Sequence, residues 1–283
     1  SRQMTRRLIQ KNPDAIVMIT GCSAQAHAEA FAAIEGVSAV VGNRAKLRVA
    51  EIARGLMETG KPQAPIVEVP SLDGADFESM SITRFARARA YVKIQDGCES
   101  RCAYCAIPAA RGPVRSKPMD EVIAEVTALT EGGAREIVLT GIETGAWGRD
   151  LGSLRLQDLL VEIDKIPHIG RIRLGSLDPT VMTQDFVDKI KDLSSLAPHF
   201  HLSMQSGCDA TLSRMKRKYD TARYYESVEL LRKHFHIFFR HCLIQYRHGF
   251  CGRFDRRLCG RFSRGLNRGF HGRRYRRFCG GVG

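Results

Sequence analysis

The sequence predicts an α/β protein with two parts, and three observations support this prediction. Apolar runs of strand length alternate with segments of helical periodicity through residues 89–235. A shorter set of alternating strands and helices occupies residues 1–59, and residues 60–88 carry three prolines between the two sets. Alternation of this kind is typical of a parallel sheet with right-handed crossovers, either doubly wound or barrel-like.

Residues 1–59 are expected to form part of a small α/β domain. Apolar residues predict strands at 15–19 and 39–41, and helical spacing predicts helices at 25–34 and 46–56. Two strands and two helices bury too little surface to form an obvious independent unit. Residues 60–88 are expected to be a linker, because Pro62, Pro65, Pro70 and Gly74 interrupt any sustained period.

Four strands and four helices are expected in residues 89–235. The strands are at 91–94, 136–139, 172–174 and 201–204, and apolar residues at helical spacing lie at 122–129, 156–163, 186–190 and 224–231. In parallel α/β folds the loops after the carboxyl ends of the strands converge on one face. Polar clusters follow all four strands, at 95–105, 140–145, 175–179 and 205–209. Their side chains are therefore expected to share one site.

The basic charge is concentrated at the end of the chain. Of a net charge of +14, most lies in residues 236–283, which hold 12 Arg, no Lys and one acidic residue, Asp255. The rest of the chain is mildly basic, so composition alone is weak evidence for a nucleic-acid partner. The tail is also rich in Gly, Phe and Cys, a bias that resists a packed core. We expect this tail to be non-native, most simply the product of a reading-frame shift near Phe235.

The cysteine content and the hydropathy pattern bear on the compartment. Nine cysteines without a secretory signal point to a cytoplasmic protein whose cysteines serve metal binding or catalysis. No stretch approaches the roughly 18 to 20 consecutive apolar residues that cross a bilayer, so no membrane association is expected. Because the sequence begins at Ser1 rather than at Met, we expect a fragment of a longer protein. The oligomeric state is not predicted.

The strongest chemical signal is Cys98-x3-Cys102-x2-Cys105, in the loop after the first strand of the larger part. Three thiolates within eight residues can hold one metal centre, and three ligands to a four-iron cluster leave one iron open. S-adenosylmethionine (SAM) can chelate such an iron. Zinc is the alternative, but it needs a fourth ligand, and no second Cys-x2-Cys or His pair follows nearby. The spacing therefore favours a [4Fe-4S] cluster.

Five motifs resemble those of the radical SAM methylthiotransferases, over about residues 15–235. They lie at residues 21–25, 98–105, 110–116, 139–145 and 204–209. The runs at 139–148 and 215–219 look most like the branch that acts on threonylcarbamoyladenosine at position 37 of tRNA. The resemblance implies a partial parallel (β/α) radical SAM barrel at 89–235, preceded at 1–59 by part of the family's small α/β domain. The start of that domain, the end of the barrel and a C-terminal RNA-binding β-barrel are expected to be missing.

The resemblance also implies the reaction. Cys98, Cys102 and Cys105 would hold the [4Fe-4S] cluster whose electron cleaves SAM to a 5′-deoxyadenosyl radical. The radical would take the hydrogen from C2 of the adenine, and a second SAM would supply the methyl group carried on sulfur. The implied partners are tRNA and an electron donor such as a flavodoxin or a ferredoxin.

Several other residues have an implied place at this site, and each has a simpler alternative. Tyr104 would pack by the SAM adenine, or merely cover the core. Gly141 and Glu143 would meet the amino acid end of SAM, or form an ordinary turn. Ser176 and Gln205 would form hydrogen bonds in the pocket, or serve as a helix cap and a turn residue.

Two arginines and one further cysteine complete the implied site. Arg111 and Arg115 would pair with tRNA phosphate or with the substrate carboxylate, or remain solvated at the surface. Cys22 matches a family position that joins two earlier cysteines in a second iron-sulfur cluster, which takes part in sulfur insertion. Neither earlier cysteine is present, so a free thiol is the better description. We therefore expect the chain as given to cleave SAM but not to complete the methylthiolation.

Other functions remain open at this point. The same chemistry would serve methylthiolation of isopentenyl-adenosine in tRNA, or of an aspartate in a ribosomal protein. A function of another class is a non-catalytic RNA-binding protein that acts through its basic tail. Iron content separates the enzyme from the binder, because a pure RNA binder needs no iron.

Overall fold

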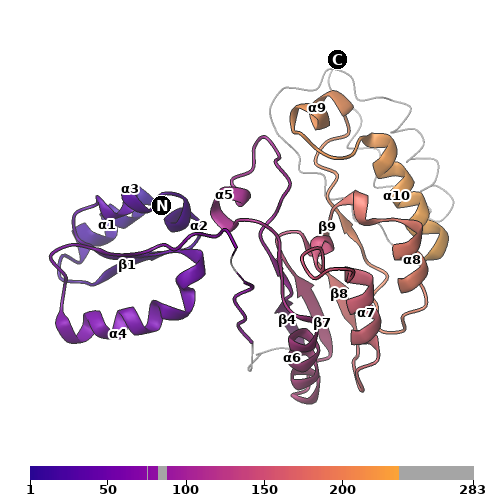
Figure 1. The fold of residues 1–283 in the computed structure, drawn as a ribbon, viewed down its shortest axis with the longest axis horizontal. Coiled ribbons are helices and arrows are strands. Elements are labelled where there is room, and N and C mark those ends of the chain that lie inside the picture. The colour runs from indigo at the N-terminus through magenta and orange to yellow at the C-terminus, as the bar shows by residue number, and fades with distance from the viewer. Residues whose placement is uncertain (75, 82–87, 236–283) are drawn as a thin grey trace, which may run out of the picture.

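The computed structural model describes residues 1–74, 76–81 and 88–235. Two α/β units make up this part of the chain, a smaller one at the N-terminus and a larger one from residue 88 onward (Figure 1). The tail at 236–283, and with it the expected frame shift, lies outside the described residues.

The smaller unit is built on a three-stranded parallel sheet. Its strands are β1 (Val17–Thr20), β2 (Val37–Val41) and β3 (Ile66–Glu68), in that order. One face of the sheet carries α1 (Arg2–Lys11), α2 (Cys22–Ala26) and α3 (Ala28–Ala32), and the other carries η1 (Asn43–Arg48) and α4 (Val49–Thr59) (Figure 1). The unit therefore has three layers.

The central strand β2 explains how these layers hold together. All five of its residues are buried. Val40 packs with Phe31 on the face of α3, whereas Val41 packs with Ile52 and Leu56 of α4 on the opposite face. A strand that is covered on both sides is expected to be largely apolar. In β2 the one polar residue is Ser38, whose hydroxyl accepts from the backbone N–H of Val17 at 3.2 Å.

Two expectations for the smaller unit differ from the structure. Residues 66–68, which we expected to lie in a linker, form the edge strand β3 between Pro65 and Pro70. Prolines are tolerated beside a short edge strand, and Ile66 and Val67 are 39% and 50% exposed there. The helix expected at 25–34 is divided into α2 and α3 at His27, whose φ of −143° and ψ of 45° are not helical.

The larger unit confirms the prediction of a parallel α/β fold. β4 (Arg89–Lys93), β7 (Glu136–Thr140) and β8 (Ile172–Leu174) pair in parallel in that order, and β9 (Ser176–Leu177) pairs in parallel with β10 (His201–Leu202). One apolar core joins the strands to α6 (Met119–Glu131), α7 (Leu156–Asp164), α8 (Gln184–Ile190) and α10 (Thr221–His234). Strands and helices alternate along the chain in this unit, as Figure 1 shows.

The helix α6 shows how the sequence specifies this packing. Val122, Val126 and Leu129 lie on one face of the helix and are almost completely buried. Burial of each such side chain stabilises the fold by about 1.5–3 kcal/mol. The helix ends at Gly132, and Gly133 follows with a φ of +94°, a conformation that glycine adopts without strain.

Several short elements of the larger unit were not expected. β5 (Gln95–Asp96) pairs antiparallel with β6 (Arg115–Ser116), and the chain between them includes α5 (Ile107–Arg111). The 3-10 helices η2 (Thr144–Ala146) and η3 (Pro179–Val181), and the helix α9 (Asp209–Arg214), occur in loops that follow strands. These elements are too short to carry a recognisable apolar period.

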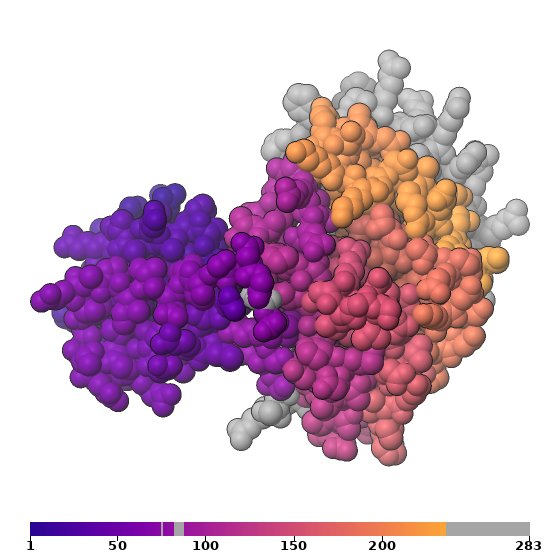
Figure 2. Space-filling view, viewed as in Figure 1, coloured from indigo at the N-terminus to yellow at the C-terminus, as the bar shows by residue number. Residues whose placement is uncertain are grey.

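The two units touch through α2 and α5. Asn43 donates its side-chain N–H to the carbonyl of Ala110 at 2.6 Å, and the side-chain oxygen of Gln25 accepts from the backbone N–H of Asn43 at 2.8 Å. Figure 2 shows the smaller unit on one side of the larger one. In the described part of the chain, no helix has both the length and the apolar character needed to cross a membrane.

Candidate functional site

Residues 97–106, which we call the cysteine loop, carry Cys98, Cys102 and Cys105 and lie between β5 and α5. The first residue of this loop, Gly97, determines the path of its backbone. Gly97 has a φ of +75°, and a Cβ atom at this position would lie 1.7 Å from the carbonyl oxygen of Pro113. The next residue, Cys98, donates its backbone N–H to the carbonyl of Gly112 at 3.0 Å. The antiparallel β5–β6 ribbon therefore holds both ends of the loop, and only glycine fits where the two segments meet.

Each of the three loop cysteines accepts a hydrogen bond from an N–H group. The backbone N–H of Ser100 donates to the sulfur of Cys98 at 3.3 Å, and that of Ile107 donates to the sulfur of Cys105 at 3.4 Å. The sulfur of Cys102 accepts instead from the guanidinium group of Arg217, at 3.2 Å. All three cysteines are free and partly buried. Donors of this kind suit thiolate ligands of an iron-sulfur cluster, whose properties depend on hydrogen bonds to sulfur.

The arrangement of the thiols also separates two kinds of metal centre. Among the residues that the structure describes, no three His, Cys, Asp or Glu side chains converge closely enough to hold a single metal ion. A zinc ion would require such convergence. In a four-iron cluster each thiolate binds a different iron, so its sulfurs need not meet at one point. The positions of the three thiols are therefore compatible with a four-iron cluster.

Glu143 lies beside the cysteine loop, as the sequence predicts. The thiol of Cys98 donates to the carboxylate of Glu143 at 3.3 Å, although 45 residues separate them along the chain. Burial, assisted by the nearby Glu143 charge, raises the pKa of the Cys98 thiol, against the opposing effect of the Ser100 N–H. Arg149 forms an ion pair with the same carboxylate at 3.6 Å. The two loops that follow β5 and β7 therefore share one site.

Gln95 joins these two loops, and sequence reasoning did not single it out. Its fully buried side chain donates to the carbonyls of Asp96 and Gly97 at 2.8 and 2.7 Å, and accepts from the backbone N–H of Glu143 at 2.9 Å. A Cβ atom at Gly141 would lie 2.8 Å from the side-chain oxygen of Gln95. Gly141 thus lets the second loop approach Gln95, which gives this glycine a structural role at the predicted position.

The remaining predicted cofactor residues lie in the chain that follows β5, β8 and β10. Tyr104 is 54% exposed and lies on the cysteine loop. Ser176 begins β9, and its hydroxyl contacts the Nδ1 atom of His201 on the neighbouring strand at 2.8 Å. Gln205 follows β10 with a φ of +60°, an uncommon conformation for a residue other than glycine. Their proposed contacts with SAM stay predictions.

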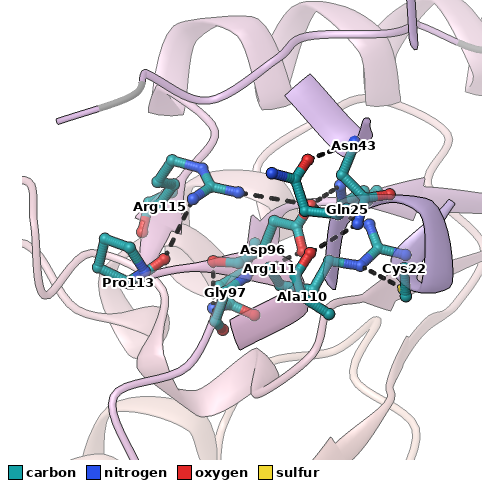
Figure 3. Close-up of polar contacts among 12 residues, drawn as sticks. Cys22, Gln25, Asn43, Asp96, Gly97, Ala110, Arg111, Pro113 and Arg115 are labelled. Carbon is teal, nitrogen blue, oxygen red and sulfur yellow. Dashed lines mark hydrogen bonds and ion pairs between the residues drawn. The ribbon is translucent and has the colours of Figure 1, made fainter. Parts of the chain in front are cut away.

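Arg111 and Arg115 converge on Asp96, from the chain that follows the cysteine loop (Figure 3). Arg111 lies 3.3 Å and Arg115 lies 3.8 Å from the same carboxylate oxygen, and Lys93 lies 2.6 Å from it. Burial opposes ionisation of Asp96, but the hydrogen bond and charge of Lys93, the N–H of Gly97 and the charge of Arg111 together lower its pKa. Both arginines therefore have partners within the chain, and their predicted contact with tRNA stays a prediction.

Cys22 reaches the larger unit through Arg111. It begins α2, directly after β1, and its sulfur accepts from the Nε atom of Arg111 at 3.1 Å (Figure 3). The other cysteines of the described residues are the three of the loop and Cys208, and none of them forms a disulfide. The structure therefore places a free thiol here, in contact with Arg111 at the end of α5. A role for Cys22 in a second cluster stays a prediction.

A cavity of about 650 Å³ lies apart from these residues. It is lined by Arg89, Glu136 and Arg171, among others. Arg89 and Glu136 are the first residues of β4 and β7, so the cavity is at the amino ends of the strands. Ligands of parallel α/β folds bind at the carboxyl ends, where the cysteine loop lies. We therefore do not include this cavity in the candidate site.

Comparisons with known proteins agree with the fold and with the cysteine loop. Residues 92–246 match the family described as the Radical SAM superfamily, which is more than half of the chain. The structure resembles the radical S-adenosylmethionine methyltransferase TsrM from Kitasatospora setae, with a TM-score of 0.59 and 18% identity over 81% of this chain and 52% of that one. It also resembles the cobalamin-dependent S-adenosylmethionine radical enzyme OxsB, with a TM-score of 0.53 and 9% identity over 81% of this chain and 36% of that one.

Curated relatives are more similar in sequence. The chain is 34% identical to the threonylcarbamoyladenosine tRNA methylthiotransferase MtaB of Bacillus subtilis, over 82% of this chain and 52% of the relative. It is 35% identical to MtaB of Aquifex aeolicus, over 82% and 56%. It is 33% identical to the tRNA-2-methylthio-N(6)-dimethylallyladenosine synthase of Dictyoglomus thermophilum, over 80% and 51%. The chain spans about half the length of the curated relatives it matches. Fold, cysteine loop and sequence match together show that the chain belongs to the radical SAM superfamily.

Proposed function

We propose that this chain is the radical-generating part of a tRNA methylthiotransferase that modifies C2 of N6-threonylcarbamoyladenosine at position 37. The observation that carries the proposal is the cysteine loop. Its three thiols lie at the carboxyl end of a parallel sheet, each accepts an N–H donor, and one of them contacts Glu143. Cys98, Cys102 and Cys105 would hold a [4Fe-4S] cluster, with SAM as the co-substrate.

When bound, the cluster supplies the electron that cleaves SAM to a 5′-deoxyadenosyl radical. The chain's own residues hold the reactants in place. The carboxylate of Glu143 suits the ammonium group of SAM, and Gln95 fixes the backbone of Glu143 by accepting its N–H. Gly141 lacks a side chain, so the backbone of this loop can pass close to Gln95 and to a ligand.

The choice of substrate rests on sequence similarity and on two motifs. Relatives named as threonylcarbamoyladenosine enzymes are 32–35% identical to the chain, and those named as dimethylallyladenosine enzymes are 32–34% identical. Identity alone therefore separates the two branches only weakly. The runs at 139–148 and 215–219 favour the first branch. Methylthiolation of isopentenyl-adenosine or of a ribosomal-protein aspartate are the alternatives.

The proposal includes a compartment and partners. The substrate is tRNA, the electron donor is a protein such as a flavodoxin or a ferredoxin, and both are cytoplasmic. A non-catalytic RNA-binding protein is the alternative of another class. A binder of that kind would have no use for three thiols that each accept an N–H donor, and this favours the enzyme.

A complementation experiment tests the proposed function. A strain that lacks the full-length gene receives the wild-type gene, the Cys102→Ala variant, or the Cys208→Ala variant as a matched control. Mass spectrometry of tRNA nucleosides should show the 2-methylthio derivative of threonylcarbamoyladenosine with the wild type and with Cys208→Ala, but not with Cys102→Ala. If this derivative is present without the gene, the proposed substrate is wrong. If instead the dimethylallyl derivative depends on the gene, the second branch is correct.

A further inference from the structure

The positively charged side chain of Arg217 lies beside the sulfur of Cys102, one of the three proposed cluster ligands. One terminal nitrogen of its guanidinium group donates to the sulfur of Cys102 at 3.2 Å, and the other donates to the carboxylate of Asp178 at 2.8 Å. The side chain is only 11% exposed. Its Nε atom is buried and has no hydrogen-bond partner in the described residues. An arginine is not kept in such a place by solvation, so its contacts with sulfur and carboxylate are what define its position.

Contacts with Asp178 and Tyr219 hold this guanidinium group, and a backbone hydrogen bond joins its segment to the cysteine loop. Asp178 caps η3: its Oδ1 atom accepts from the backbone N–H and the hydroxyl of Thr180 at 3.0 and 2.6 Å, and this leaves Oδ2 for Arg217. The ring of Tyr219 lies 4.9 Å from the central carbon of the guanidinium group. The backbone N–H of Ala103 donates to the carbonyl of Met215 at 3.1 Å, which ties the cysteine loop to the segment that carries Arg217.

The three loop sulfurs therefore differ in the charge that they face. Cys98 and Cys105 accept from neutral backbone N–H groups, whereas Cys102 accepts from a cation. Hydrogen bonds to sulfur and nearby charge are two of the factors that set the reduction potential of an iron-sulfur cluster. A cation stabilises the reduced cluster more than the oxidised one, because the reduced cluster carries one more negative charge.

We propose that Arg217 is a positioning residue of Cys102 that raises the reduction potential of the cluster, and that Asp178 limits this effect by partly neutralising the guanidinium charge. The inference rests on the proposed function, in which Cys102 is a cluster ligand. It gives the run at 215–219 a physical role at the site, in addition to its value as a marker of the branch.

The pair predicts potential shifts of opposite sign. Arg217→Met removes the cation and leaves the Asp178 carboxylate near the cluster, so the midpoint potential should become more negative. Asp178→Asn keeps an acceptor for Thr180 but removes the negative charge, so the potential should become more positive. A role of Arg217 in packing alone would not reverse sign between these two variants, because both substitutions would disturb the same contact.

The test uses the full chain with its cluster reconstituted anaerobically. Wild type, Arg217→Met, Arg217→Lys, Asp178→Asn and Arg214→Met are compared; Arg214 is an exposed arginine of the same segment that contacts Thr211. Iron content is measured first, and the midpoint potential is then measured by redox titration followed by electron paramagnetic resonance, without SAM. Arg217→Lys should lie closer to wild type than Arg217→Met, because it keeps the charge, and Arg214→Met should not differ from wild type.

The outcomes distinguish this inference from the proposed function. If the wild-type chain holds no cluster, the proposed function fails. If the cluster forms but Arg217→Met and Asp178→Asn leave the potential unchanged, or shift it in the same direction, the inference is wrong and the proposed function stands. If Arg217→Met does not retain iron, a positive shift in Asp178→Asn supports the inference, and its absence overturns it.

Discussion

Replacement of Gln95 by Met should weaken the binding of SAM to the reconstituted protein about 100-fold. Gln95 forms three buried hydrogen bonds that join the backbone before Cys98 to the backbone of Glu143. Met has a similar volume but forms none of them. At about 1 kcal/mol for each hydrogen bond, the two loops together lose about 3 kcal/mol of ordering free energy. Binding of SAM has to restore that order, and each 1.4 kcal/mol or so corresponds to a factor of about ten in affinity.

Calorimetric titration with SAM of the anaerobically reconstituted protein measures this effect. The matched control is Gln157→Met. Gln157 lies on α7, away from the cysteine loop, and its buried side-chain amide donates to Asp185 at 2.9 Å. The control should lower the thermal stability and leave the SAM affinity unchanged. Loss of iron from Gln95→Met would be a stronger form of the expected effect, because two of its bonds fix the start of the loop. An affinity within about threefold of wild type, at equal iron content, would refute the reasoning.

Substitutions at three other places test separate parts of the structure. Gly97→Ala should abolish iron binding, because the added Cβ would overlap the carbonyl of Pro113. The control Gly133→Ala, whose Cβ would meet open space, should leave the iron content unchanged. Equal iron content in the two variants would contradict this. Lys117→Met leaves the buried Glu125 charge without its ion pair, so it should reduce the free energy of unfolding, measured by urea titration, by about 3–5 kcal/mol. The double variant Lys117→Met/Glu125→Leu should recover most of this loss. Burial opposes ionisation of Glu136, but Arg173, Arg89 and Arg171 lower its pKa, so its contribution to stability is present at neutral pH and is lost as the pH falls through the folded-state pKa. Glu136→Gln should therefore be less stable than wild type at pH 7 and equal to it in strong acid; a difference in stability that stays constant with pH would exclude this explanation.

Much of the larger unit could be predicted from local sequence patterns. The strand Ile172–Leu174 has the expected bounds, and β7 extends the expected strand by one residue, to Thr140. Their apolar residues are buried, on both faces of β7 and on one face of β8, and the runs of apolar residues in the sequence indicate this. The strands β3, β5 and β6 could not be predicted in the same way. They are two or three residues long and include exposed or polar residues, so their pairing partners create them.

The site divides along the same line. The sequence points to the three cysteines because their spacing lies within one loop, and to Glu143 because it follows a strand of the same sheet. Gln95 and Arg217 were missed as site residues, although the sequence contains a polar loop around the first and a basic run around the second. Gln95 contacts a residue 48 positions away, and Arg217 contacts a residue 115 positions away. No local pattern carries information over such distances, and only the folded sheet brings these groups together.

The measurement that tests the central claim most directly is the iron content of the anaerobically reconstituted chain. We expect about four irons per chain, with visible charge-transfer absorbance, held by Cys98, Cys102 and Cys105. The variant with all three cysteines replaced by Ala should lose both iron and absorbance, whereas the double variant Cys22→Ala/Cys208→Ala should retain them. A triple variant that kept its iron and its absorbance would contradict the account, because other thiols would then hold the cluster.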